Sequence, residues 1–159
     1  MTDVSPQNIV EAYTMAVKAS EAKTETKLQA YDKVIAFCEN NQECSLENST
    51  KRNMLLFWAY DQVAEAKLAE KKYPDALDIW RKASRLPGEP EVKIKLGLKM
   101  LDAVDKGRFS IPEKARQIVE ITGYLQKAYS ENNDEAGMQR MERLQNTAAY
   151  LLGGSKLKH

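Results

Sequence analysis

Apolar residues recur along the chain at spacings of three and four positions, and alternating apolar and polar stretches are short. This spacing places the apolar side chains on one face of an α-helix, so the pattern predicts an all-α fold. Start and stop signals divide the chain into about seven helices. The predicted helices span residues 6–20, 25–40, 47–70, 74–86, 90–106, 112–130 and 134–152. We expect residues 1–152 to form a single domain and residues 153–159 to form a flexible tail.

Capping residues set several of these boundaries. Ser5–Pro6 offers an N-cap followed by a proline at the first helical position. Ser110 and Glu113 form a capping box, in which each side chain accepts a hydrogen bond from a backbone N–H of the other. Gly153–Gly154 is expected to end the last helix, because glycine disfavours a helix interior.

Residues 57–90 contain two predicted helices joined by a short turn, with small, aromatic and proline residues at fixed places. These residues are Ala64, Tyr73, Ala76, Trp80, Ala83 and Pro87. Small residues let two antiparallel helices approach closely, and the aromatic rings fill the space beside them. In a frame of about 34 residues, this segment resembles a tetratricopeptide repeat. An ordinary antiparallel bundle is the alternative explanation of the same spacing.

The segments after residues 57–90 fit this frame more loosely. Residues 91–129 resemble a degenerate repeat with a longer turn, and residues 134–152 a capping helix with one apolar stripe. The stripe consists of Met138, Met141, Leu144, Ala148 and Leu151, opposite Gln139, Arg140, Glu142 and Arg143. The resemblance therefore implies antiparallel helix pairs that stack as a short tetratricopeptide-like solenoid.

Residues for catalysis are scarce. The only histidine, His159, is the last residue, which removes histidine-based triads and most general-base chemistry at neutral pH. The chain has no glycine-rich phosphate loop, and Cys38 has no histidine to act as its base. A metal bound by Cys38 and Cys44 would lack further soft ligands. We therefore expect no enzymatic activity, no cofactor and no metal.

Localisation depends on the two cysteines and on the start of the chain. The aromatic and aliphatic run at residues 54–60 is far shorter than the roughly 20 residues that span a bilayer. Because no signal peptide is visible, we expect a cytoplasmic protein without a membrane partner. A disulfide between Cys38 and Cys44 would instead suit a periplasmic or secreted protein from which a leader had been removed.

The resemblance also implies a binding groove between residues 47–70 and 90–106, lined by the first helix of each repeat. Its candidate residues are Trp58, Asp61, Glu65 and Leu68, followed by Val92, Lys95, Lys99 and Asp102. Charges of both signs and one aromatic anchor would suit a peptide segment of a partner protein. The alternative is that these charges solubilise the helices and that Trp58 belongs to the core.

The leading hypothesis is a non-enzymatic adaptor or small chaperone, similar in architecture and size to the small bacterial secretion chaperones built from three such repeats. The second hypothesis is a nucleic-acid-associated protein that uses the basic residues of segment 81–116. The overall balance of 24 basic and 23 acidic residues argues against nucleic-acid binding. The third is a subunit of a homo-oligomer, such as a homodimer, with Met138 and Met141 in the interface.

Overall fold

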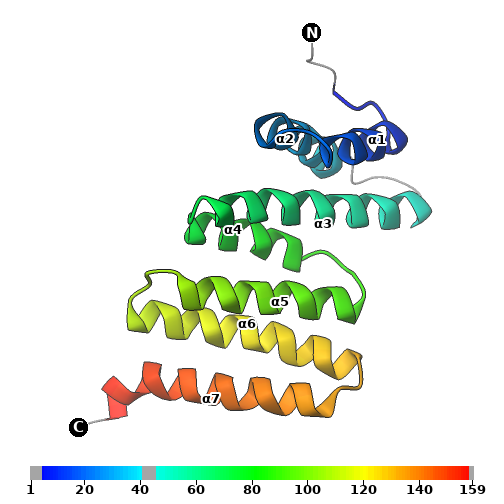
Figure 1. The fold of residues 1–159 in the computed structure, drawn as a ribbon. Helices are drawn as coiled ribbons and strands as arrows, with labels where there is room; N and C mark the ends of the chain where they lie inside the picture. Colours follow the sequence, from blue (N-terminus) through cyan, green and yellow to red (C-terminus); the bar gives the residue numbers. More distant parts are fainter. Residues whose placement is uncertain (1–4, 41–45, 158–159) are drawn as a thin grey trace. The chain divides into compact units, whose positions relative to one another are not determined.

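The computed structural model describes residues 5–40 and 46–157. Within these residues the chain forms seven α-helices and no β-strand, as the apolar spacing predicted (Figure 1). The helices are α1 (Ile9–Ala19), α2 (Thr24–Asn40), α3 (Leu46–Ala69), α4 (Tyr73–Ser84), α5 (Pro90–Lys106), α6 (Ile111–Glu131) and α7 (Glu135–Leu157). The predicted all-α class and the order of its helices are confirmed.

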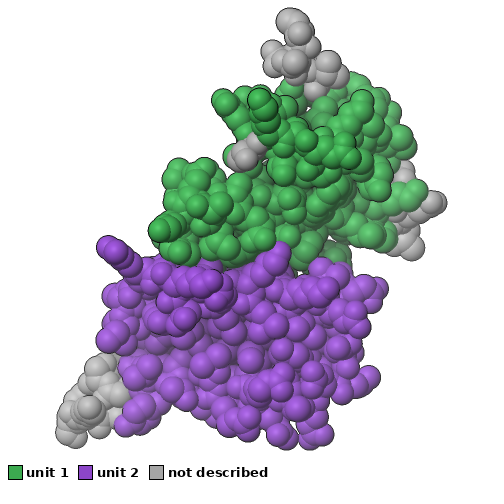
Figure 2. Space-filling view, viewed as in Figure 1, with its two compact units in different colours: residues 1–87 green, residues 88–159 purple. Residues whose placement is uncertain are grey.

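The chain divides into two compact units, Met1–Pro87 and Gly88–His159, coloured separately in Figure 2. The first unit contains α1 to α4, and the second contains α5 to α7. Inside each unit, every helix packs against the helix that precedes or follows it in the sequence (Figure 1). This packing fits the predicted helix pairs. The tetratricopeptide-like stacking and the single domain over residues 1–152 stay predictions.

Small residues allow α3 and α4 to pack closely in the first unit. Ala64 of α3 and Ala76 of α4 are fully buried, and so is Trp80, the largest buried side chain. The indole Nε1–H of Trp80 donates a hydrogen bond of 2.9 Å to Oδ1 of Asp61 on α3. This bond gives the buried indole N–H a partner, so α3 and α4 are joined by both packing and polar contact.

In the second unit, glycines allow neighbouring helices to pack closely. A Cβ atom added to Gly97 of α5 would lie 2.4 Å from Cδ2 of Leu125 on α6, which is fully buried. A Cβ atom on Gly137 of α7 would lie 2.4 Å from Cδ1 of Tyr129 on α6. Both positions therefore need a residue without a side chain, because the neighbouring helix occupies that space.

The helix ends confirm one half of the predicted Ser110–Glu113 capping box and correct two other predictions. Ser110 caps α6, and its Oγ accepts a hydrogen bond of 3.3 Å from the backbone N–H of Glu113. The first helix begins at Ile9 and not beside Ser5, because Asn8 is its N-cap. The side-chain Oδ1 of Asn8 accepts a hydrogen bond of 2.9 Å from the backbone N–H of Glu11. A polar side chain bonded to the helix start outweighed the preference of proline for the first turn.

The last helix is longer than predicted. The prediction ended it before Gly153–Gly154, whereas α7 continues to Leu157. None of the described glycines has a positive φ. A glycine costs about 1 kcal/mol in a helix interior, which lowers helix stability without blocking the helical backbone.

Candidate partner-binding site

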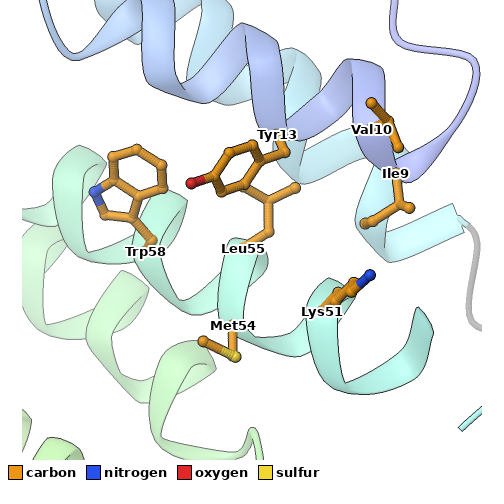
Figure 3. A pocket seen from close by; sticks show the side chains of 7 residues that line it. All are labelled: Ile9, Val10, Tyr13, Lys51, Met54, Leu55 and Trp58. Atoms are coloured by element: carbon orange, nitrogen blue, oxygen red, sulfur yellow. The ribbon is translucent and has the colours of Figure 1, made fainter. Parts of the chain in front are cut away.

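An open apolar cavity of about 480 Å³ lies between α1 and α3 of the first unit (Figure 3). Its lining residues are Ile9, Val10 and Tyr13 of α1 and Lys51, Met54, Leu55 and Trp58 of α3. Apolar concavities of this size, with a few polar groups, are typical of binding sites in proteins.

The wall from α1 is exposed because this helix is apolar on two faces. The helix buries its small side chains, including Ala12 and Ala16, and packs more extensively against α2 than against α3. Its larger side chains lie on the other side, where Val10 is 70% exposed and Tyr13 is 59% exposed. Close packing by the alanines therefore leaves the larger apolar side chains of α1 in contact with solvent.

The wall from α3 follows the helical period. Lys51, Met54, Leu55 and Trp58 stand at positions i, i+3, i+4 and i+7, which share one face over two turns. Leu55 is buried, whereas Met54 is 69% exposed. Figure 3 shows Tyr13 on α1 and Leu55 and Trp58 on α3, and all three line the cavity. The cavity therefore has a buried floor and an exposed apolar rim.

The aromatic part of this floor is held by a buried ring. The rings of Trp58 and Tyr31 of α2 meet edge to face, with centroids 6.1 Å apart and an interplanar angle of 67°. Tyr31 is fully buried, and burial raises the pKa of its hydroxyl. This contact fixes Trp58 against α2 while its ring still lines the cavity.

A polar cluster joins α2 to α3 behind the same wall. The hydroxyl of Tyr60 donates a hydrogen bond to Oε2 of Glu39. Nη1 of Arg52 donates a hydrogen bond of 3.1 Å to the carbonyl oxygen of Cys38. Burial, together with the bond to Glu39 and its negative charge, raises the pKa of Tyr60. Tyr60 therefore stays protonated and keeps donating well above neutral pH.

Replacing Tyr60 with phenylalanine should lower the free energy of unfolding by about 1 kcal/mol at pH 7, because the hydrogen bond to Glu39 is lost. The folded-state pKa of Tyr60 lies above the unfolded value near 10, so its contribution is complete below pH 10 and is lost as the pH rises further. Urea unfolding from pH 7 to 11 should therefore show a shallower alkaline loss of stability in Tyr60→Phe. An identical alkaline loss in both proteins would contradict this role.

The structure places the predicted site residues of α3 in different surroundings. Trp58 lines the cavity between α1 and α3, and its ring is only partly exposed. Asp61 accepts the hydrogen bond of Trp80 and so acts inside the first unit. Glu65 and Leu68 are half-buried. Of these residues, Trp58 is the one that lines the apolar cavity.

The predicted site residues of α5 lie in the second unit. Lys95 is exposed, Lys99 is half-buried, and Val92 is 40% exposed. Asp102 forms an ion pair with Lys106 at 2.9 Å. The groove predicted from the sequence would combine residues of both units, and it stays a prediction.

The methionine interface proposed for a homo-oligomer is corrected at Met141 alone, since Met138 is half-buried and the oligomer itself stays a prediction. Met141 is only 7% exposed and belongs to the interior of the second unit, so its side chain is not available to another copy. Leu144 and Leu151, from the same predicted stripe, are exposed instead. Cys38 is buried, and its predicted disulfide partner, Cys44, lies outside the described residues.

Carboxylates pair with several basic residues of segment 81–116. The pairs are Arg81 with Asp78 at 3.0 Å, Lys93 with Glu131 at 3.5 Å, Lys106 with Asp102 at 2.9 Å and Lys114 with Asp105 at 3.4 Å. These pairs reduce the positive charge that segment 81–116 offers to phosphates, and they weaken the case for nucleic-acid binding.

Sequence reasoning missed the rim residues Val10, Tyr13 and Met54. A signal was present, because Val10, Tyr13 and Val17 stand at i, i+3 and i+7 beside a second face of alanines. In the structure the alanine face is buried, and the face with the larger apolar residues is the exposed one.

No helix in the described part of the chain combines the length and apolar character needed to cross a bilayer. Among the same residues, no group of three or more His, Cys, Asp or Glu side chains is placed to hold a metal ion. The chain matches no protein-family model, and no curated protein or solved structure shows significant similarity to it.

Proposed function

We propose that this chain is a non-enzymatic interaction module, an adaptor or small chaperone, that binds a segment of a partner protein in the cavity between α1 and α3. The observation that carries the proposal is the exposure of Val10, Tyr13 and Met54, from 59% to 70%, around a concave apolar floor. Contiguous exposed apolar surface on a folded protein marks an interaction site.

The arrangement of floor and rim suits a protein partner. Leu55 and Trp58 form a fixed apolar floor, on which a large apolar side chain of the partner would be buried as an anchor. The exposed rim would then exclude water around that anchor. The resemblance of residues 57–90 to a tetratricopeptide repeat supports the interaction role alone, because stacked repeats present extended binding surfaces. The choice of the cavity between α1 and α3 rests on its exposed apolar lining.

The double variant Val10→Glu/Met54→Glu tests this proposal, because both side chains are exposed and their replacement should leave the fold intact. We expect the wild-type chain to retain one protein from a nuclease-treated lysate of the source organism. The double variant should bind that protein at least about ten-fold more weakly, because two apolar contacts are replaced by charges. Titration of the purified partner measures the two affinities.

Ile111→Glu is the matched control, since Ile111 is also 70% exposed but lies in the second unit. It should bind the partner as the wild type does. The variant Lys95→Glu/Lys99→Glu tests the groove predicted from the sequence. If this variant loses the partner while Val10→Glu/Met54→Glu retains it, the cavity between α1 and α3 is not the binding site.

A further inference from the structure

A second cavity, of about 400 Å³, lies between α1 and α2 of the first unit. Its lining includes Val10 of α1, which is 70% exposed, and the small side chains of Ala19 and Ala30. Small side chains let another helix approach closely, and an exposed valine gives that helix an apolar surface to cover. The groove between α1 and α2 therefore suits the side of another helix.

Two of the described residues that line this groove are charged, and their charges have opposite signs. Glu11 and Lys18 of α1 are both exposed and stand seven positions apart, which places them on one face of the helix. About 10 Å along the helix axis separates them, and neither forms an ion pair with a described residue. Both charges therefore face solvent without an opposite charge beside them.

The polar groups near these charges are already bonded within the chain. Thr14 lies between Glu11 and Lys18, and its hydroxyl donates a hydrogen bond of 2.9 Å to the carbonyl oxygen of Val10. The carboxylate of Glu11 accepts hydrogen bonds from Nδ2 of Asn8 at 3.0 Å and from the backbone N–H of Gln7 at 3.4 Å. The middle of the groove can therefore be covered without leaving the Thr14 hydroxyl unpaired.

The order of the two charges defines the helix that fits. It must have a basic and an acidic side chain two turns apart, and it must run antiparallel to α1. The helix α1 has this pattern itself. In an antiparallel pair of α1 helices, related by a twofold axis near Thr14, Glu11 of each copy would face Lys18 of the other. A parallel pair in the same register would instead place like charges opposite each other.

We propose that α1 of a second copy of this chain occupies the groove between α1 and α2, so that the chain forms an antiparallel homodimer. The helix α1 has 11 residues and is about 16 Å long, so each copy offers a small surface. An interface at the small end of the usual range gives a weak dimer, and we expect a dissociation constant of about 1–100 µM.

Sedimentation equilibrium of the full chain at concentrations up to about 500 µM measures this self-association. We expect the wild type to be mainly monomeric at low concentration and dimeric at the highest one. A wild type that stays monomeric throughout would overturn the proposal, because the groove would then not hold a second copy.

Lys18→Glu should raise the dissociation constant of the dimer by about ten-fold, because both charge pairs become repulsive. Lys95→Glu is the matched control, since it makes the same change of charge on an exposed lysine of the second unit. It should leave the dissociation constant unchanged. Equal losses in the two variants would reflect net charge, and no loss in Lys18→Glu would move the interface elsewhere; either result contradicts the proposal.

Glu11→Lys should weaken the dimer as Lys18→Glu does, and an equimolar mixture of the two variants should associate again. In the mixed dimer, the two positive charges of a Glu11→Lys chain face the two negative charges of a Lys18→Glu chain. A mixture that associates no more tightly than either variant alone would overturn the antiparallel arrangement. Circular dichroism checks that both variants fold, since Glu11→Lys also loses the bonds from Asn8 and Gln7. Lys18→Glu leaves these bonds intact, so its comparison with Lys95→Glu decides the proposal by itself.

Met54→Glu separates this proposal from the proposed function, on which it does not depend. Met54 lines the cavity between α1 and α3, whereas Lys18 lines the groove between α1 and α2. Met54→Glu should therefore weaken binding of the partner protein and leave the dimer unchanged, and Lys18→Glu should do the reverse. Loss of the dimer in Met54→Glu but not in Lys18→Glu would place the second copy in the cavity between α1 and α3 and overturn the proposal.

Discussion

Replacing Trp80 with alanine should lower the free energy of unfolding by about 3–5 kcal/mol. Trp80 is the largest fully buried side chain of the described residues, so its removal leaves a cavity between α3 and α4. The variant also removes the indole N–H that donates a hydrogen bond to Asp61. Because small proteins are stable by only about 5–15 kcal/mol, the first unit should be largely unfolded at moderate urea concentrations.

Urea unfolding followed by circular dichroism measures the effect, with two variants to divide it. Trp80→Phe keeps an aromatic ring but loses the indole N–H, and it should cost less than Trp80→Ala. Asp61→Asn keeps an acceptor for that N–H. It should therefore lower the free energy of unfolding by less than about 1 kcal/mol, which is the usual contribution of one whole hydrogen bond. A loss below about 1 kcal/mol in Trp80→Ala would show that this ring does not fill the core.

Gly97→Ala and Gly123→Ala should change stability in opposite directions. The new Cβ of Gly97→Ala would meet the buried Leu125 side chain at 2.4 Å, and relief of this clash should cost about 2 kcal/mol. The new Cβ of Gly123→Ala would lie 3.6 Å from Nε2 of Gln145, an ordinary contact. Gly123 is inside α6, so this variant should gain about 0.5–1 kcal/mol from helix propensity.

Thermal and urea unfolding of the two variants beside the wild type test this difference. Both variants add one methyl group to a helix of the second unit, so the comparison isolates the approach of α5 to α6. If Gly97→Ala is as stable as Gly123→Ala, then these helices are farther apart than the contact of Gly97 with Leu125 indicates.

Local signals were sufficient for most of the fold. The apolar spacing and the Ser110 cap placed α6 correctly, because both act within one helix. The start of α1 was misplaced because two local signals competed, Pro6 and the side chain of Asn8, and only the structure shows which one bonds to the helix. Alanines at Ala64 and Ala76 predicted a close helix crossing, and both are fully buried.

The candidate site was harder to predict, because it joins residues that are distant in the sequence. Val10 and Met54 belong to different helices, and no periodicity within either helix shows that they share a cavity. Asp61 was expected to face a partner, and this stays a prediction; the sequence did not show that Asp61 also accepts a hydrogen bond from Trp80 inside the fold. Such pairings depend on how helices pack, which the spacing of residues along one helix does not determine.

Site-specific photo-crosslinking tests the central claim, that a partner protein occupies the cavity between α1 and α3, most directly. Tyr13, at the rim, and Tyr150, on α7 of the second unit, are exposed to 59% and 66%. Each is replaced in turn by p-benzoylphenylalanine, and the cells of the source organism are irradiated. We expect a covalent adduct with one partner protein from position 13 and none from position 150. An adduct from position 150 alone, or equal labelling from both positions, would contradict it.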